Sequence, residues 1–331
     1  MPIIDAPVAA LSWLGRQGTR AVAALVIVGI AFPPIGSVLK PYVTEAVFLL
    51  LCIAFLQVDI TAFKTYVRRP AIVLAATAWT SVAIPVLFGV ICLTSGLDKR
   101  VPELFLALML QAVASPMMAA PALAALMGLD ATLVLVTVIT STALLPLTAP
   151  AFALVFVGPN LSISPLVLAT KLFAILAGAA LAGFVVRRVF GLAAIERQRE
   201  RINGLNILVL FVFVAAVMES VGARVLASPV TTTVLAVLAF VVFFAVLFLT
   251  VLLFLFAGRK HALALGFMAS QRNMGLMLAA TAGALPDLTW LYFALSQFPI
   301  YLSPHFLQPL ARRILGRVPD AYVPAQGRKR D

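Results

Sequence analysis

Long apolar runs alternate with short connectors along this chain, and the connectors carry proline, glycine, aspartate or asparagine. A helix needs about 20 residues to cross the roughly 30 Å hydrocarbon layer of a bilayer, and most of the runs reach that length. Such spans are predicted to be helical, because lipid offers the backbone no hydrogen-bonding partner. The pattern predicts ten transmembrane helices, near residues 20–38, 42–62, 70–94, 103–127, 131–157, 164–186, 204–220, 229–257, 262–285 and 288–315.

Composition places the chain in the membrane class. Hydrophobic residues make up 63% of the 331 residues, charged residues make up 11%, and the mean hydropathy is +1.12. A soluble domain carries charge on about a quarter of its residues, so this chain could not cover a water-exposed surface. Membrane lipid is therefore predicted to cover much of the surface of the chain. The predicted fold class is an all-α membrane protein, with residues 1–331 as one polytopic domain.

The positive charges are unevenly distributed among the connectors. If the N-terminus lies inside, only Lys40, Lys99, Arg100 and Arg224 fall in outside connectors. Cytoplasmic connectors of membrane proteins carry an excess of Lys and Arg. The sequence thus predicts an inner-membrane protein with both termini in the cytoplasm, including a basic tail at residues 316–331. Because topology explains the net charge of +12, no nucleic-acid partner is predicted.

Ten helices divide into two repeats of five, near residues 20–157 and 164–315. The fourth helix of each half carries Ala-Ser near its middle, at Ser115 and at Ser270, and each ends at a turn with an aspartate. When a half contains an odd number of helices, the second copy inserts upside down. The sequence therefore predicts two inverted repeats, an arrangement that is common in transporters.

The middles of these two helices, the fourth and the ninth of the chain, are unfavourable for helical structure. Pro116 and Pro121 remove backbone donors from the fourth helix. The ninth helix has four polar residues in a row at mid-membrane, from Ser270 to Asn273. Disrupted backbone and polar side chains are tolerated at this depth where they line a cavity. We expect two broken helices with a binding site near the breaks.

Arg272 is the most informative residue, because it lies about ten residues from either end of the predicted ninth helix, too far to reach water along the helix. Two interpretations remain open. The guanidinium can bind a carboxylate or sulfate group of a substrate, for which its geometry is suited. It can instead donate to carbonyls of the opened backbone or pair with a buried acid. The available acids, Glu45, Asp59 and Glu219, lie near helix ends.

Several short stretches carry a resemblance to a known family. They are Arg69-Pro70 and Pro85 in the third helix, Ser141-Thr142 with Pro146 and Pro150 in the fifth, and Asn273 in the ninth. In these features the chain resembles the bile acid:sodium symporter family, from about residue 44 to residue 315. The resemblance implies a panel domain (helices 1, 2, 6 and 7) and a core domain (helices 3–5 and 8–10). It also implies that helices 4 and 9 cross where substrate and sodium bind.

The resemblance also shows where this chain departs from the family. Residues that match the family's sodium ligands are replaced here by Ala120, Pro121, Val134, Val138 and Met268. Thr80 and Arg272 each stand where the family has a glutamine. Sodium needs several hard oxygen ligands, so its binding at the family sites is predicted to be lost. We interpret Arg272 as a fixed replacement for the sodium charge, and no metal or cofactor is predicted.

The sequence therefore predicts a secondary transporter of a small organic anion, of the bile acid:sodium symporter kind, and predicts no enzyme. Three alternatives remain open: a sodium-coupled symporter with shifted ion ligands, a membrane sensor that keeps the fold without transporting, and, with less support, efflux of an oxyanion such as arsenite. No oligomeric state is predicted. The candidate substrate-binding residues are Thr80, Gln111, Ser115, Pro116, Ser270, Gln271, Arg272 and Asn273.

Overall fold

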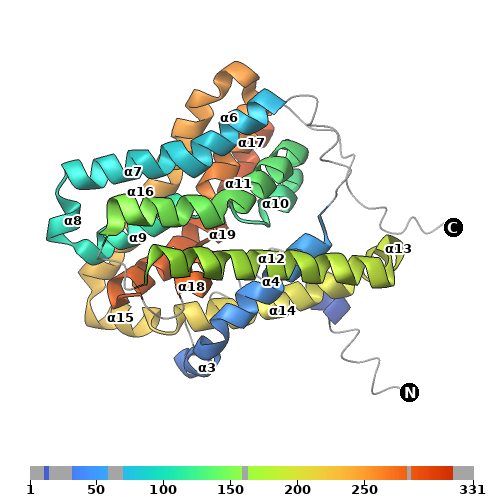
Figure 1. Ribbon diagram of the computed structural model, residues 1–331, viewed down its shortest axis with the longest axis horizontal. Coiled ribbons are helices and arrows are strands. Elements are labelled where there is room, and N and C mark those ends of the chain that lie inside the picture. Colours follow the sequence, from blue (N-terminus) through green and yellow to red (C-terminus); the bar gives the residue numbers. More distant parts are fainter. Residues whose placement is uncertain (1–10, 15–31, 59–69, 159–162, 282–284, 316–331) are drawn as a thin grey trace.

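The computed structural model describes residues 11–14, 32–58, 70–158, 163–281 and 285–315 (Figure 1). Helices and turns make up these residues, and no strand longer than an isolated bridge occurs among them. The first half contains α3 (Pro33–Leu39), η1 (Lys40–Tyr42), α4 (Val43–Leu56), α6 (Pro70–Ala78), η2 (Trp79–Ala83), α7 (Ile84–Thr94), α8 (Leu97–Arg100), α9 (Pro102–Val113), α10 (Ala120–Leu126), α11 (Ala131–Phe152) and η3 (Ala153–Val157).

The second half is also helical. It contains α12 (Pro165–Phe190), α13 (Leu192–Arg197), α14 (Arg199–Met218), α15 (Val221–Ala227), α16 (Pro229–Leu253), η5 (Leu255–Ala257), α17 (Arg259–Ser270), α18 (Met274–Thr281) and α19 (Asp287–Leu315). The prediction of an all-α membrane protein is thus confirmed, whereas the ten-helix count, the inverted repeats and the panel and core domains stay predictions.

Two predicted spans agree with the structure to the residue. The third runs through α6, η2 and α7, and the fifth runs through α11 and η3. Much of the predicted first helix, the end of the second and the basic tail at 316–331 lie outside the described residues. The segment expected to connect helices 7 and 8 is itself helical, as α15. Arg224 suggested a loop there, but α15 is a short helix at a surface, where a charge is tolerated.

Proline marks the beginning of many of these helices. Pro33, Pro70, Pro102, Pro165 and Pro229 are each the first residue of a helix. The first helical N–H has no partner within the helix, so proline loses nothing there and its fixed φ angle suits the first turn. The same residue type therefore starts helices at the ends of the spans and disrupts them in the middle.

Within the described residues, six helical stretches are long and apolar enough to cross a membrane. They are Pro33–Leu56, Pro70–Thr94, Ala131–Val157, Pro165–Phe190, Arg199–Ala227 and Pro229–Leu253. The predicted fourth and ninth helices are absent from this set because each is divided into two shorter helices, α9 with α10 and α17 with α18. Several such stretches in one chain indicate a multi-pass membrane protein.

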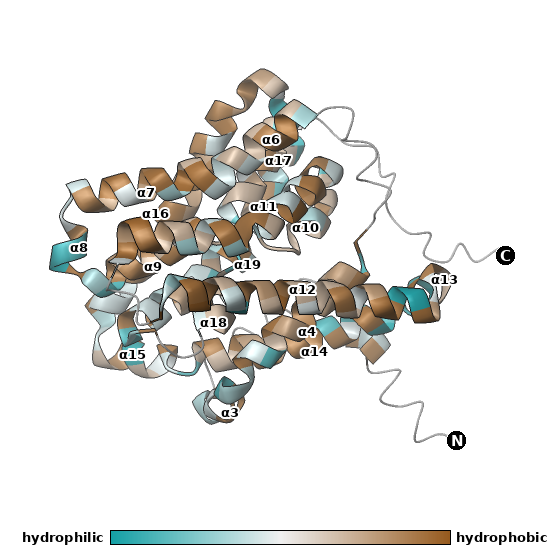
Figure 2. Ribbon diagram, viewed as in Figure 1, coloured by the Kyte–Doolittle hydropathy of each residue, from teal (hydrophilic) through white to brown (hydrophobic). Residues whose placement is uncertain are grey.

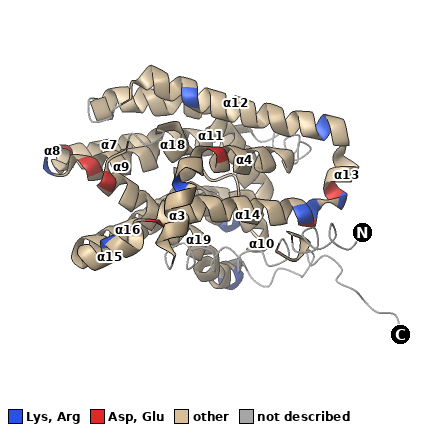
Figure 3. Cartoon of the chain, turned by 90° about the horizontal axis from the view of Figure 1, so that it is seen from below, with Lys and Arg blue, Asp and Glu red and all other residues tan. Residues whose placement is uncertain are grey.

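The helices pack in two groups. In one, α4 lies between α12 and α14, and α3 packs against α14. In the other, α16 packs against α17 and α19, and α11 contacts α10 and α17. The groups meet where α11 packs against α12, α18 against α4 and α12, and α14 against α19. The long helices are largely brown, and so hydrophobic, in the ribbon of Figure 2. Figure 3 shows most charged residues near helix ends and in the short helices α8 and α13.

One close helix contact involves Gly266, in the middle of α17. A Cβ atom added there would lie 2.5 Å from Val251 Cγ2 and 2.8 Å from the backbone oxygen of Leu247, both on α16. Glycine is therefore required for the contact between α16 and α17. We expect Gly266→Val to destabilise the protein by about 1–3 kcal/mol, the usual cost of overpacking.

This prediction is checked by thermal unfolding of the purified protein in detergent. Ala75→Val adds the same kind of bulk at an exposed position of α6 and is the matched control. Equal melting temperatures for the two variants would contradict the packing argument.

Candidate functional site

The two broken helices meet at their breaks. Between α9 and α10, and between α17 and α18, the chain is extended, and Pro116 and Arg272 form an antiparallel bridge. Met117 N donates to the oxygen of Gln271 at 2.6 Å, and Asn273 N donates to the oxygen of Ser115 at 2.8 Å. Each break thus supplies backbone partners that the other lacks, which lipid could not supply. The expected breaks are present, and they are hydrogen-bonded to each other.

Arg272 stabilises this crossing from one side. Its side chain is buried, with the residue 3% exposed, and Nη1 donates to the oxygens of Ala114 at 2.8 Å and Thr80 at 3.2 Å. Ala114 follows the last residue of α9, so the cation lies at the negative end of that helix. Thr80 lies in η2, a π-helical segment where the regular α-helical hydrogen bonding is interrupted. Nη1 of Arg272 therefore donates to carbonyl oxygens of the opened backbone, as one of the two interpretations of this residue proposed.

The other two guanidinium nitrogens of Arg272, Nε and Nη2, are buried and have no hydrogen-bond partner among the described residues. None of the ion pairs found there involves Arg272. A buried cation without a counter-charge is costly, and its remaining donors stay available to an anion. Arg272 is one of the residues that line a cavity, so its buried charge lies close to whatever enters.

Asn273 begins the helix on the far side of the break. Its Oδ1 accepts a hydrogen bond from Leu276 N at 3.1 Å, as an N-cap residue does for the first turn of a helix. The N-terminus of α18 is thereby fixed beside the crossing. A helix N-terminus carries partial positive charge, which adds to that of Arg272.

A cavity of about 330 Å³ lies against the crossing. One wall comes from α4 and α14, and the opposite wall comes from the residues just after both breaks together with α19. Met117, Met118, Leu210, Phe213 and Met274 form apolar parts of the lining. The polar lining residues besides Arg272 are Gln57, Asn203, Asn206, Asn273, Gln297 and Tyr301.

Comparison of the sequence with known protein families identifies the family of this chain. A family model for the sodium bile acid symporter family matches residues 44–229, more than half of the chain. The chain belongs to the sodium bile acid symporter family. The resemblance expected from the sequence is thereby confirmed, and the chain is a multi-pass membrane transporter of the bile acid/sodium symporter kind. A comparison with curated proteins found no match.

Within this symporter-family protein, only part of the predicted site lines the cavity. Arg272, Asn273 and Pro121 do so. The other candidates lie around the crossing and bind elsewhere within the protein. Tyr292 donates from its hydroxyl group to Gln111 Oε1 at 2.6 Å, and Gln271 Nε2 donates to Ser303 Oγ at 2.6 Å. These side chains connect α9 and the α17–α18 break to α19.

Hydroxyl groups of the remaining candidates are used in a similar way. Ser270 Oγ donates to the oxygen of Phe267, and Thr80 Oγ1 lies 3.1 Å from Ser141 Oγ across the interface of the third and fifth spans. Ser115 Oγ is buried without a partner in the described part of the chain, and Pro116 contributes the bridge to Arg272. Their roles toward a substrate stay predictions.

The positions predicted from the sequence to match the family's sodium ligands are apolar. Ala120, Val134, Val138 and Met268 are fully buried, and none has a side-chain oxygen. Pro121 lines the cavity but likewise offers no side-chain oxygen. No group of three or more His, Cys, Asp or Glu that could hold a metal ion is found among the described residues. These side chains are poorly suited to a hard cation such as sodium.

Sequence reasoning missed the polar wall opposite the crossing. Gln57 Nε2 donates to Asn203 Oδ1 at 3.0 Å, joining the end of α4 to the beginning of α14. Asn206 lies one turn further along α14, and Gln297 comes from α19. Gln57, Asn203 and Asn206 lie near the ends of apolar runs, where polar residues are expected in any membrane helix. The three-residue spacing of the two asparagines, which places them on one helix face, was the available signal.

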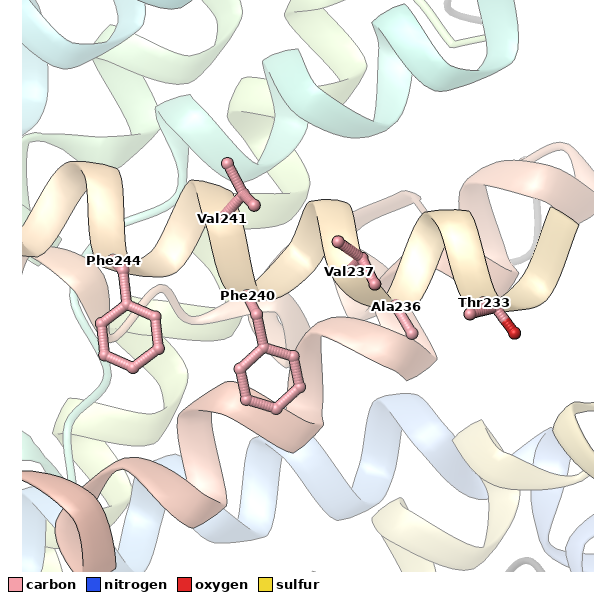
Figure 4. A pocket seen from close by; sticks show the side chains of 6 residues that line it. All are labelled: Thr233, Ala236, Val237, Phe240, Val241 and Phe244. Carbon is pink, nitrogen blue, oxygen red and sulfur yellow. The ribbon is translucent and has the colours of Figure 1, made fainter. Parts of the chain in front are cut away.

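A second, larger hollow has a different character. It measures about 540 Å³ and is lined by Ala236, Val237, Phe240 and other residues that all belong to α16 (Figure 4). A groove formed by the side chains of one apolar helix is part of a lipid-facing surface. It lacks the convergent polar groups that mark a binding site.

The N-cap at the crossing gives a testable prediction. We expect Asn273→Ala to destabilise the protein by about 0.5–2 kcal/mol, because the first turn of α18 loses its side-chain acceptor. Thermal unfolding in detergent measures the effect. Asn206→Ala is the control, since Asn206 lines the same cavity but has no hydrogen bond within the described residues that the change would remove. A control as unstable as Asn273→Ala would show that the cap contributes nothing.

Proposed function

We propose that this protein carries a small organic anion across the inner membrane without sodium at the family's usual sites. In this proposal both termini lie in the cytoplasm and the solute enters the cavity beside the crossing. The observation that carries the proposal is Arg272, a buried cation at the cavity wall whose partners are backbone oxygens and not a carboxylate.

The electrostatics of the cavity support an anion. Arg272 and the N-terminus of α18 contribute positive charge, and no Asp or Glu is found among the described lining residues. In the low-dielectric interior, a charge at such a short distance acts strongly on a ligand. A cation or a neutral solute would gain nothing from this arrangement, whereas an anion would offset the cost of the buried guanidinium.

The lining also bounds the chemistry of the solute. A volume of about 330 Å³ is at the lower end of the range for small-molecule pockets. Three methionines, Met117, Met118 and Met274, give an adaptable apolar wall, and side-chain amides face it. A compact carboxylate or sulfonate with an apolar part fits a cavity that is lined partly by apolar side chains and partly by amides.

Arg272 also accounts for the loss of sodium. In our proposal its Nη1 binds the oxygens of Ala114 and Thr80 and supplies at the crossing the positive charge that an ion would bring. A covalently attached cation does not dissociate, so the sodium gradient would not drive the cycle. Transport would then proceed by movement of one helix group against the other around the cavity, as in other carriers with broken helices.

A second candidate is a sodium-coupled symporter whose ion ligands have shifted. Two buried oxygens near the crossing, Ser115 Oγ and Gln271 Oε1, have no hydrogen-bond partner among the described residues. Oxygen atoms of this kind can coordinate sodium. The two candidates differ in whether anion binding requires sodium.

The test is thermal stabilisation of the purified protein by benzoate, methanesulfonate and cholate, each as the sodium and as the potassium salt. Ligand at about 100 times its dissociation constant stabilises the folded state by about 2.7 kcal/mol. We expect an anion to raise the melting temperature equally in both salts, and we expect the shift to be lost in Arg272→Gln and partly kept in Arg272→Lys.

Asn206→Asp keeps the test decisive if substitutions at the crossing fail to fold. It adds a negative charge to the cavity on α14, away from the crossing, and should weaken anion binding, whereas Asn206→Gln should not. Stabilisation that requires sodium and persists in Arg272→Gln would overturn the proposal in favour of shifted ion ligands.

A further inference from the structure

His261 faces a hydrogen-bond acceptor with each of its two ring nitrogens. Nε2 lies 3.3 Å from Asp130 Oδ2, and Nδ1 lies 2.8 Å from the backbone oxygen of Ala257. Neither a carboxylate nor a carbonyl can donate, so both ring nitrogens must carry a hydrogen to satisfy both contacts. The protonated, cationic imidazole is the form that can donate to both, and in that form the contact with Asp130 is an ion pair. The neutral ring would turn a lone pair toward Asp130 or toward Ala257.

The pair is placed where its protonation can be reversible. The side chains of His261 and Asp130 are 27% and 18% exposed, so water can deliver a proton although the pair is largely shielded from solvent. Histidine changes its charge within the physiological pH range. Asp130 is further fixed because its Oδ1 accepts a hydrogen bond from Leu133 N at 2.9 Å, capping α11.

The pair joins the two broken helices at the ends far from the crossing. His261 is the third residue of α17, which continues to the break at Gln271. Asp130 closes the turn after α10, which starts just beyond the break at Pro116. A helix of the length of α17 spans about 18 Å and moves as a rigid unit. The ion pair and the crossing thus hold α17 at its two ends, and the pair reaches the other broken helix through the turn between α10 and α11.

The other charged groups around His261 do not replace Asp130. Arg259 and Lys260 are its exposed neighbours on α17, and His305, Arg312 and Arg313 are the ionisable residues of the last turns of α19. The other elements packed against α17, which are α10, α11, α16 and η5, contain no ionisable residue within their bounds. Among these groups Asp130 is the carboxylate that a protonated His261 can bind.

We propose that His261 and Asp130 form a proton-binding site that clamps α10 to α17 and so controls the geometry of the crossing. Protonation of His261 closes the ion pair, and loss of the proton releases the two half-helices. This inference rests on the proposed function, in which the site links the proton concentration to the anion cavity. It supplies a proton-responsive element in a chain whose sodium-ligand positions are apolar.

The experiment compares hydrogen–deuterium exchange of the full-length protein with that of variants, at pH about 5.5 and at pH about 8. We expect amides of α10, α17 and the crossing to exchange about fivefold more slowly in wild type than in His261→Gln at the lower pH, the size of effect that one partly exposed ion pair can supply. At the higher pH the difference should disappear. Comparing variants at one pH removes the intrinsic pH dependence of exchange.

Two further variants sharpen the result. His261→Lys keeps a permanent cation and should stay protected relative to His261→Gln at both pH values, and His305→Gln, an exposed histidine on α19, should behave as wild type. Exchange in His261→Gln that matches wild type at both pH values would overturn the proton site. Because no anion is used, that result is independent of whether the proposed anion transport is found.

Discussion

The structure depends on the backbone pairing between two interrupted helices. In a bilayer, the free N–H and C=O groups of a broken helix have no water to bind, so a single break would be strongly unfavourable. Here the hydrogen bonds from Met117 to Gln271 and from Asn273 to Ser115 let the two breaks satisfy each other. Arg272 and the cap of Asn273 complete this arrangement at the adjoining helix ends. The cavity exists because these segments are extended and not helical.

A fixed cation at this point changes what the site can bind. In the sodium bile acid symporter family an ion is expected near the crossing, and here the matching positions are alanine, valine, methionine and proline. Arg272 binds backbone oxygens at the crossing, and its cation is attached covalently to the chain. In the proposed function, the preference of the cavity for an anion therefore comes from the covalent structure of the chain and needs no bound ion.

The broken helices are also held at their outer ends. At one end of the bundle, Leu288 N donates to Glu103 Oε2 and Thr289 Oγ1 donates to the oxygen of Glu103, so the start of α9 is joined to α19. At the other, His261 and Asp130 join α17 to the turn after α10. Of these contacts, the histidine pair is the one that we propose as a proton-binding site. In that proposal, α17 connects the pair to the crossing, because it runs from His261 to the break at Gln271.

The sequence alone determined the membrane class, the spans at 70–94 and 131–157, the interruption of two helices and the importance of Arg272, because hydropathy, proline and a mid-membrane charge are local properties. It left both interpretations of Arg272 open, and it missed Gln57, Asn203 and Asn206. Which oxygens Arg272 binds, and which polar residues near helix ends face a common cavity, depends on how distant segments pack. Only the tertiary structure decided this, since residues 80, 114 and 272 become neighbours through the crossing and not through any spacing along the chain.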